Sequence, residues 1–229
     1  FDFIQKPGGK SITFDIDKVK KDLIEKIRFS AIANLTQRFG KKKEFEAAKR
    51  KISRYYDLVL IGTSTGGPGT LAKIFKIMPA SFDIPIAVVQ HIKEGYSKSL
   101  AEGLNSASAL DISEVDGFTN IVNGKVYIAK AGYHLEFCAT GTQLKLTNSE
   151  FRNGFRPSVD VLFESALANF KGKILAVVLT GMGNDGAAGA AKLYNAGHTV
   201  IIQDENTSVV WGMPRVIYEA GTYHAILPI

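Results

Sequence analysis

The chain has 229 residues, of which 45% are hydrophobic and 22% charged, a composition typical of soluble globular proteins. No run approaches the roughly eighteen consecutive apolar residues that a membrane-spanning helix needs, and no signal peptide is recognisable. A single cysteine excludes an internal disulfide and fits a reducing compartment. We therefore expect a cytoplasmic protein without membrane insertion.

The formal net charge of +6 is concentrated near the start of the chain. Thirteen basic and four acidic residues lie between Lys18 and Arg54, whereas residues 55–229 carry thirteen basic and fifteen acidic residues. Such a run is more often a solvated helical face than a nucleic-acid site, and no binding motif accompanies it. We expect no nucleic-acid partner. A non-catalytic binding module that uses the cluster Lys41–Lys43 is kept as an alternative.

Residues 10–54 are interpreted as a helical, basic linker. Apolar side chains recur every three or four residues from Ile16 to Ala31, which predicts an amphipathic helix. The stretch from Gln37 to Arg54 is polar, and we expect it to be only partly helical.

After Tyr55 the pattern becomes that of an α/β protein. Apolar runs at Leu58–Ile61, Ile86–Val89, Ile174–Leu179 and Thr199–Ile202 alternate with Gly-rich turns and helical patterns. Continuous β-branched runs of this kind predict a mostly parallel, doubly wound (Rossmann-like) sheet flanked by helices. Between residues 124 and 147, three short runs (126–128, 135–137 and 144–146) predict a small antiparallel hairpin excursion.

Three reactive side chains follow predicted strands directly. Ser64 follows the first strand, His91 the second, and Asp185 the long apolar strand that ends at Leu179. In an open parallel sheet, sites gather beyond the carboxyl ends of the strands. We therefore expect these three side chains to meet at one edge of the sheet.

The segment Gly62-Thr63-Ser64-Thr65-Gly66 satisfies the G-x-S-x-G pattern, which raises a serine hydroxyl on a sharp strand-to-helix turn. Free backbone N–H groups at the helix start, that of Thr65 among them, are suited to stabilising an oxyanion. A serine nucleophile needs a base and a group that orients the base, and His91 and Asp185 are the natural candidates.

A rival interpretation rests on residues 181–186, which match G-x-G-x-x-G after a strand, with Asp204 about twenty residues later. That pattern is typical of dinucleotide-binding oxidoreductases, but it leaves Ser64 and His91 without roles. Arg156 lies at the start of a predicted helix, and either contact with an acidic substrate or pairing with Asp160 would explain it. The remaining histidines, His134, His198 and His224, have no metal-ligand spacing and are expected to be structural or surface residues.

Taken together, several segments resemble the chemotaxis protein-glutamate methylesterase family. They are Gly62–Gly67, Gln90-His91, Arg156–Asp160, Leu179–Gly186 and Gly212–Pro214, and they occur in family order between about Asp57 and Pro228. The resemblance implies a triad of Ser64, His91 and Asp185. It also implies that Thr65 and Met182 support the triad, Met182 through its backbone N–H at the oxyanion site.

The same resemblance implies hydrolysis of glutamate γ-methyl esters on the cytoplasmic helices of chemoreceptors, and often deamidation of glutamines there, without a metal or organic cofactor. Phe1–Pro7 resembles the end of a response-regulator receiver domain, which the family carries ahead of its catalytic domain. The predicted organisation is therefore a receiver remnant (1–9), the linker (10–54) and a methylesterase domain (55–229). The receiver domain of the full-length protein is an expected partner.

Overall fold

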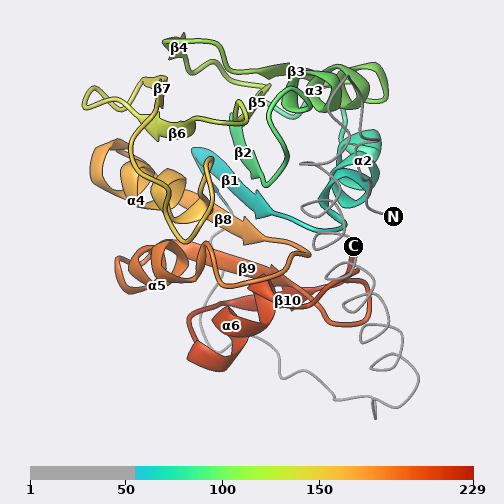
Figure 1. Cartoon of the computed structure of the whole chain (residues 1–229), viewed down its shortest axis with the longest axis vertical. Helices are drawn as coiled ribbons and strands as arrows, with labels where there is room; N and C mark the ends of the chain where they lie inside the picture. The colour runs from blue at the N-terminus through green and yellow to red at the C-terminus, as the bar shows by residue number, and fades with distance from the viewer. Residues whose placement is uncertain (1–54) are drawn as a thin grey trace, which may run out of the picture. The chain divides into compact units, whose positions relative to one another are not determined.

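The computed structural model describes residues 55–229, which form a seven-stranded sheet, a three-stranded sheet and five helices (Figure 1). The strands are β1 (Leu58–Thr63), β2 (Ile86–Gln90), β3 (Asp111–Glu114), β4 (Thr119–Asn120), β5 (Lys125–Ile128), β6 (His134–Phe137), β7 (Gln143–Thr147), β8 (Ile174–Val178), β9 (Thr199–Gln203) and β10 (Ala225–Leu227). The helices are α2 (Gly67–Ile77), α3 (Ser97–Ser106), α4 (Val159–Asn169), α5 (Ala187–Asn195) and α6 (Met213–Ala220). The predicted receiver remnant, linker and amphipathic helix lie outside the described residues.

All neighbours in the large sheet are parallel, and its order is β10-β9-β8-β1-β2-β5-β3. From the central strand β1 the chain first builds the sheet toward β2, and it later returns on the other side through β8. The order therefore reverses between β1 and β8. A crevice opens beyond the carboxyl ends of strands at such a switch point, which is where ligands bind in open α/β sheets.

Helices cover the large sheet on both faces (Figure 1). Leu58 and Leu60 of β1 pack in one core with α4, α5, α6 and the small sheet. Val59 and Ile61 point the opposite way and pack in a second core with α2 and α3. Every residue of β1 is buried, which explains its unbroken apolar run. The doubly wound fold predicted from the sequence is confirmed.

The antiparallel excursion is confirmed in part. Residues 135–137 and 144–146 lie in β6 and β7, which pair antiparallel, with β4 on the other side of β7. The assignment of 126–128 was wrong, because β5 pairs parallel with β2 and β3 in the large sheet. A three-residue apolar run carries no signal for its pairing partner, and β3 itself was not predicted.

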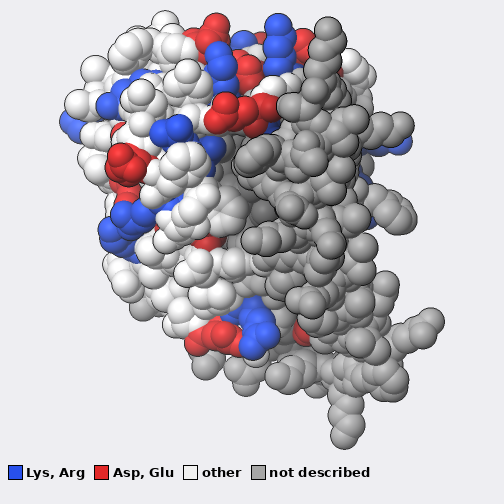
Figure 2. Space-filling view, in the orientation of Figure 1, with Lys and Arg blue, Asp and Glu red and all other residues white. Residues whose placement is uncertain are grey.

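Charges are mixed on the surface of residues 55–229. On the face shown in Figure 2, acidic and basic side chains are interspersed over the described surface, which fits the nearly balanced charge of this part of the chain. Within the same residues, no helix combines the length and the apolar character needed to cross a bilayer.

Candidate active site

Ser64 lies immediately after β1, where the chain turns into α2. Its backbone N–H donates to the carbonyl oxygen of Thr180 at 3.0 Å, and Thr63 Oγ1 donates to the same oxygen at 2.9 Å. These bonds attach the serine turn to the loop that follows the neighbouring strand β8. Ser64 is 9% exposed, so little of its surface is in contact with solvent.

His91 follows β2, and its backbone N–H donates to the carbonyl oxygen of Thr63 at 3.0 Å. The buried Gln90 amide donates through Nε2 to the carbonyl oxygens of Ser64 and His91, each at 2.9 Å. One side chain therefore holds the serine turn and the histidine backbone at a fixed separation.

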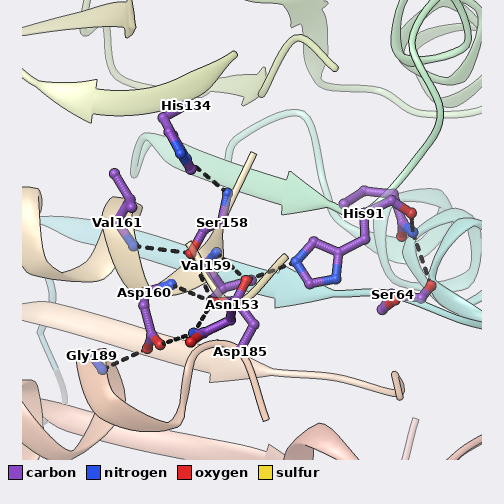
Figure 3. Close-up of polar contacts among 11 residues, drawn as sticks. Ser64, His91, His134, Asn153, Ser158, Val159, Asp160, Val161, Asp185 and Gly189 are labelled. Atoms are coloured by element: carbon purple, nitrogen blue, oxygen red, sulfur yellow. Dashed lines mark hydrogen bonds and ion pairs between the residues drawn. The ribbon is translucent and has the colours of Figure 1, made fainter. Parts of the chain in front are cut away.

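Asp185 comes from the loop between β8 and α5 and is completely buried. Its Oδ2 lies 2.7 Å from His91 Nε2, as Figure 3 shows. The same oxygen accepts the Val159 backbone N–H at 2.7 Å, while Oδ1 accepts Ser158 Oγ at 2.7 Å and the Asp160 backbone N–H at 3.2 Å. Val159 and Asp160 open α4, so the carboxylate occupies the positive end of a helix.

The surroundings of Asp185 keep it ionised. Burial by itself would raise its pKa, but the hydrogen bond and charge of His91, together with the bonds from Ser158 and Val159, lower the pKa to about 2. An ionised carboxylate can only accept a hydrogen bond. His91 Nε2 must therefore carry the proton of the 2.7 Å contact at neutral pH, because the carboxylate has none to offer.

In the neutral imidazole the second nitrogen, Nδ1, is then the one with a lone pair. It is buried and forms no hydrogen bond with any residue in 55–229. Figure 3 shows this side of the ring turned toward the Ser64 side chain. No hydrogen bond connects Ser64 Oγ with His91 in this structure. The distance between a catalytic hydroxyl and its base is often long before a substrate is bound. The arrangement places a hydroxyl, a basic nitrogen and an orienting carboxylate in series.

Two backbone N–H groups near Ser64 remain available. Those of Thr65 and Met182 donate to no residue within 55–229, although both lie in the turns that follow β1 and β8. The two turns are tied together, because Thr180 Oγ1 donates to the Thr65 carbonyl oxygen at 2.9 Å. A Cβ added at Gly181 would lie 2.8 Å from Ser64 Cβ, so this glycine permits the close approach of the two turns.

Comparison with known proteins shows the family of this chain. Residues 59–229 match the family model described as CheB methylesterase. The chain belongs to the CheB methylesterase family. Two curated relatives, both named protein-glutamate methylesterase/protein-glutamine glutaminase, are 37% identical over 243 residues (Symbiobacterium thermophilum) and 39% identical over 229 residues (Thermotoga maritima). They cover 100% and 99% of this chain, which spans 67% and 66% of their lengths.

A solved structure agrees with this assignment. The crystal structure of the Thermotoga maritima CheB methylesterase catalytic domain shares 42% identity with this chain, with a TM-score of 0.73. The match covers 76% of this chain and 93% of the Thermotoga chain. The family resemblance and the hydrolase class predicted from the sequence are confirmed.

In this CheB methylesterase chain Arg156 is engaged within its own loop. Its Nη1 donates to the carbonyl oxygens of Asn148 and Ser149 at 2.9 and 3.0 Å, and its guanidinium lies 4.4 Å from the ring centroid of Phe151. Asp160 instead accepts the Gly189 backbone N–H at 2.7 Å, so the pairing of Arg156 with Asp160 is not observed. Contact of Arg156 with a substrate stays a prediction.

The three histidines predicted to be structural or surface residues accept hydrogen bonds from backbone groups. In each of them Nδ1 accepts a backbone N–H at 3.2 Å. The donor is Ser158 for His134, Ile174 for His198 and Val200 for His224. Within 55–229, no three His, Cys, Asp or Glu side chains are arranged to hold a metal ion.

The dinucleotide interpretation finds no support in the geometry. The glycine-rich loop at 181–186 carries Asp185 to the amino end of α4. Asp204 accepts the backbone N–H of Thr207 at 2.9 Å in a local turn. A cavity of about 430 Å³ lies at the opposite, amino edge of the large sheet, beside Asp57 and Pro85, and Ser64, His91 and Asp185 do not line it.

Several site residues were missed in the sequence. Ser158 caps α4, accepting the Val161 N–H at 3.4 Å, while its Oγ also donates to Asp185. A serine before a helical pattern is a recognisable capping signal, but the signal does not show what else the hydroxyl bonds. Phe155 stacks on His91, with ring centroids 3.8 Å apart. No sequence motif around Phe155 predicts this contact.

The ionised Asp185 should stabilise the folded state. Its folded pKa of about 2 lies below the ordinary value of 3.8, so its contribution is complete above about pH 4 and is lost as the pH falls through about 2. The shift corresponds to about 2 kcal/mol. We expect the free energy of unfolding of the wild type to fall by about 2 kcal/mol more than that of Asp185→Asn between about pH 5 and about pH 2. Urea titrations at each pH measure the free energy of unfolding of both proteins. Parallel pH dependences of the two free energies would contradict the lowered pKa of Asp185.

Proposed function

We propose that this chain hydrolyses glutamate γ-methyl esters on chemoreceptors and releases methanol, with Ser64, His91 and Asp185 as its catalytic triad. The names of the relatives support the reaction. The observation that carries the catalytic assignment is the 2.7 Å contact between His91 Nε2 and the buried Asp185 carboxylate, with Nδ1 facing Ser64.

In the first step Ser64 Oγ attacks the ester carbonyl carbon while its proton passes to His91 Nδ1. The imidazole then carries a proton on each nitrogen, and Asp185 stabilises the resulting positive charge through Nε2–H. Because Asp185 is bonded by the amino end of α4, it stays ionised while the proton moves. In this arrangement Nδ1 serves as the base and Nε2 as the anchored nitrogen, the reverse of the assignment in the chymotrypsin-type triad.

The tetrahedral intermediate carries a negatively charged oxygen, which hydrogen-bond donors must stabilise. The unused N–H groups of Thr65 and Met182 are our candidates, since both lie in the turns flanking Ser64. One oxyanion donor typically contributes about 3 kcal/mol to the stabilisation of the transition state. Collapse of the intermediate transfers the proton from Nδ1 to the leaving methoxide, which departs as methanol.

Water then completes the cycle. His91 Nδ1 takes a proton from a water molecule, which attacks the acyl-enzyme and regenerates Ser64 with a free glutamate carboxylate as product. The same attack on a glutamine side chain releases ammonia instead of methanol, which would account for glutaminase activity. The protein groups named here and water suffice for both reactions.

The proposed substrates are the cytoplasmic helices of methyl-accepting chemoreceptors, which places the reaction in the cytoplasm. The receiver domain of the full-length protein is the proposed regulatory partner. Both assignments rest on the family resemblance. The alternative function is non-catalytic: a binding module that uses the basic segment before residue 55.

Removal of the Ser64 hydroxyl tests the nucleophile. Ser64→Ala should lower methanol release from methylated chemoreceptor by about three orders of magnitude or more without unfolding the protein. Ser106→Ala is a matched control, because Ser106 is an exposed helical serine bonded to Glu102. A fluorophosphonate probe should label the wild type and the control but not Ser64→Ala. Near-wild-type turnover by folded Ser64→Ala would disprove the triad.

Gly181 tests the contact between the two turns. The added Cβ of Gly181→Ala would lie 2.4 Å from Met213 Sδ and 3.1 Å from the Ser64 backbone nitrogen, so the serine turn must shift. We expect turnover to fall on the order of a hundredfold, since misplacement by about 1 Å has effects of this size. Gly103→Ala is the control, because its Cβ would meet no atom within 4 Å. Equal turnover in the two variants would refute the requirement for close approach.

A further inference from the structure

Residues 152–155 form a tight hairpin above the site. Arg152 and Phe155 exchange backbone hydrogen bonds of 3.1 and 2.9 Å, and Asn153 and Gly154 both have positive φ, 53° and 80°. Two successive left-handed residues define a type I′ turn, for which Asn-Gly is the favoured pair. The backbone of this turn is therefore well determined by its own sequence, and it presents Asn153 and Phe155 from a rigid support.

Phe155 covers one face of the His91 imidazole. The two rings are nearly parallel, with an interplanar angle of 5° and a centroid separation of 3.8 Å. Contact over the whole face restricts rotation of the imidazole about its Cβ–Cγ bond. That rotation would swing Nε2 away from Asp185 and Nδ1 away from Ser64. An aromatic face also attracts the positive charge that the imidazole acquires during the reaction.

Asn153 contacts Asp185, the carboxylate that is bonded to His91. Its Nδ2 donates to Asp160 Oδ2 at 2.9 Å and approaches Asp185 Oδ1 at 3.4 Å (Figure 3). Both carboxylates are buried, and burial together with the Asp185 charge raises the pKa of Asp160. The amide places a donor between two groups that would otherwise repel each other. The hairpin thus contacts both members of the His91–Asp185 pair.

We propose that the Asn153-Gly154 hairpin is a positioning element for the catalytic pair, in which Phe155 fixes the plane of the imidazole and Asn153 fixes the carboxylate that anchors it. The proposal rests on the proposed function. Neither side chain is assigned contact with the reacting atoms, so both act through His91 and Asp185.

The Phe155 arm of the test replaces the ring while keeping apolar volume. Phe155→Leu should lower kcat by about tenfold or more with little change in KM, because orientation rather than substrate binding is impaired. Phe155→Tyr retains the stacked ring and should restore kcat. Phe118→Leu is the matched control, since Phe118 is 76% exposed. Thermal unfolding of each variant confirms that it is folded.

The Asn153 arm removes only the amide. Asn153→Gly tolerates the positive φ of 53° and leaves the turn intact, so any effect on kcat reports the lost donor. Asn153→Asp also tolerates this φ but adds a third carboxylate beside Asp160 and Asp185, and its kcat should fall further than that of Asn153→Gly.

A spectroscopic readout separates this proposal from the proposed function. In solution NMR, the His91 Nε2–H proton should give a resolved low-field signal in the wild type and Phe155→Tyr. It should exchange too fast to observe in Phe155→Leu. Wild-type kcat in Phe155→Leu, or an unchanged Nε2–H signal, would overturn the positioning role. If neither the wild type nor any variant releases methanol, the proposed function fails. The NMR comparison still decides the positioning role in that case.

Discussion

The site depends on how one buried charge is accommodated. An ionised carboxylate without exposure to water is strongly unfavourable unless donors surround it. The protein supplies these donors to Asp185 from four sources: the first backbone N–H groups of α4, the Ser158 hydroxyl, the His91 ring and, at 3.4 Å, the Asn153 amide. Because the carboxylate must satisfy all of them at once, its position is fixed, and the orientation of the imidazole follows from it.

The parallel sheet brings the remaining groups to this carboxylate. β1 pairs with β2 on one side and β8 on the other, so the turns that follow these strands are neighbours in space. Thr180 then bonds the serine turn, and Gln90 bonds both Ser64 and His91. The separation of the serine and histidine backbones is therefore set by strand register and by the buried Gln90 side chain, and a substrate does not have to organise it.

Position along the chain predicted that Ser64, His91 and Asp185 lie at one edge of the sheet, because each follows a strand and the carboxyl ends of parallel strands share one edge. The groups that bond Asp185 were not predictable in the same way. The Asn153-Gly154 pair signals a turn, and Ser158 signals a helix start, but neither signal reveals which distant group the side chain will meet. The pairing of β5 was missed for a related reason, since its neighbours are chosen by tertiary packing and not by its own four residues.

The central claim is that the proton-accepting nitrogen of His91 is Nδ1. This follows from a carboxylate that is ionised and bonded to Nε2, and in the proposed mechanism it determines which nitrogen receives the Ser64 proton. Nitrogen NMR of the protein labelled with ¹⁵N-histidine measures this directly at neutral pH. The account predicts a protonated Nε2 and an unprotonated Nδ1 for His91. A proton on Nδ1 and a bare Nε2 would contradict it.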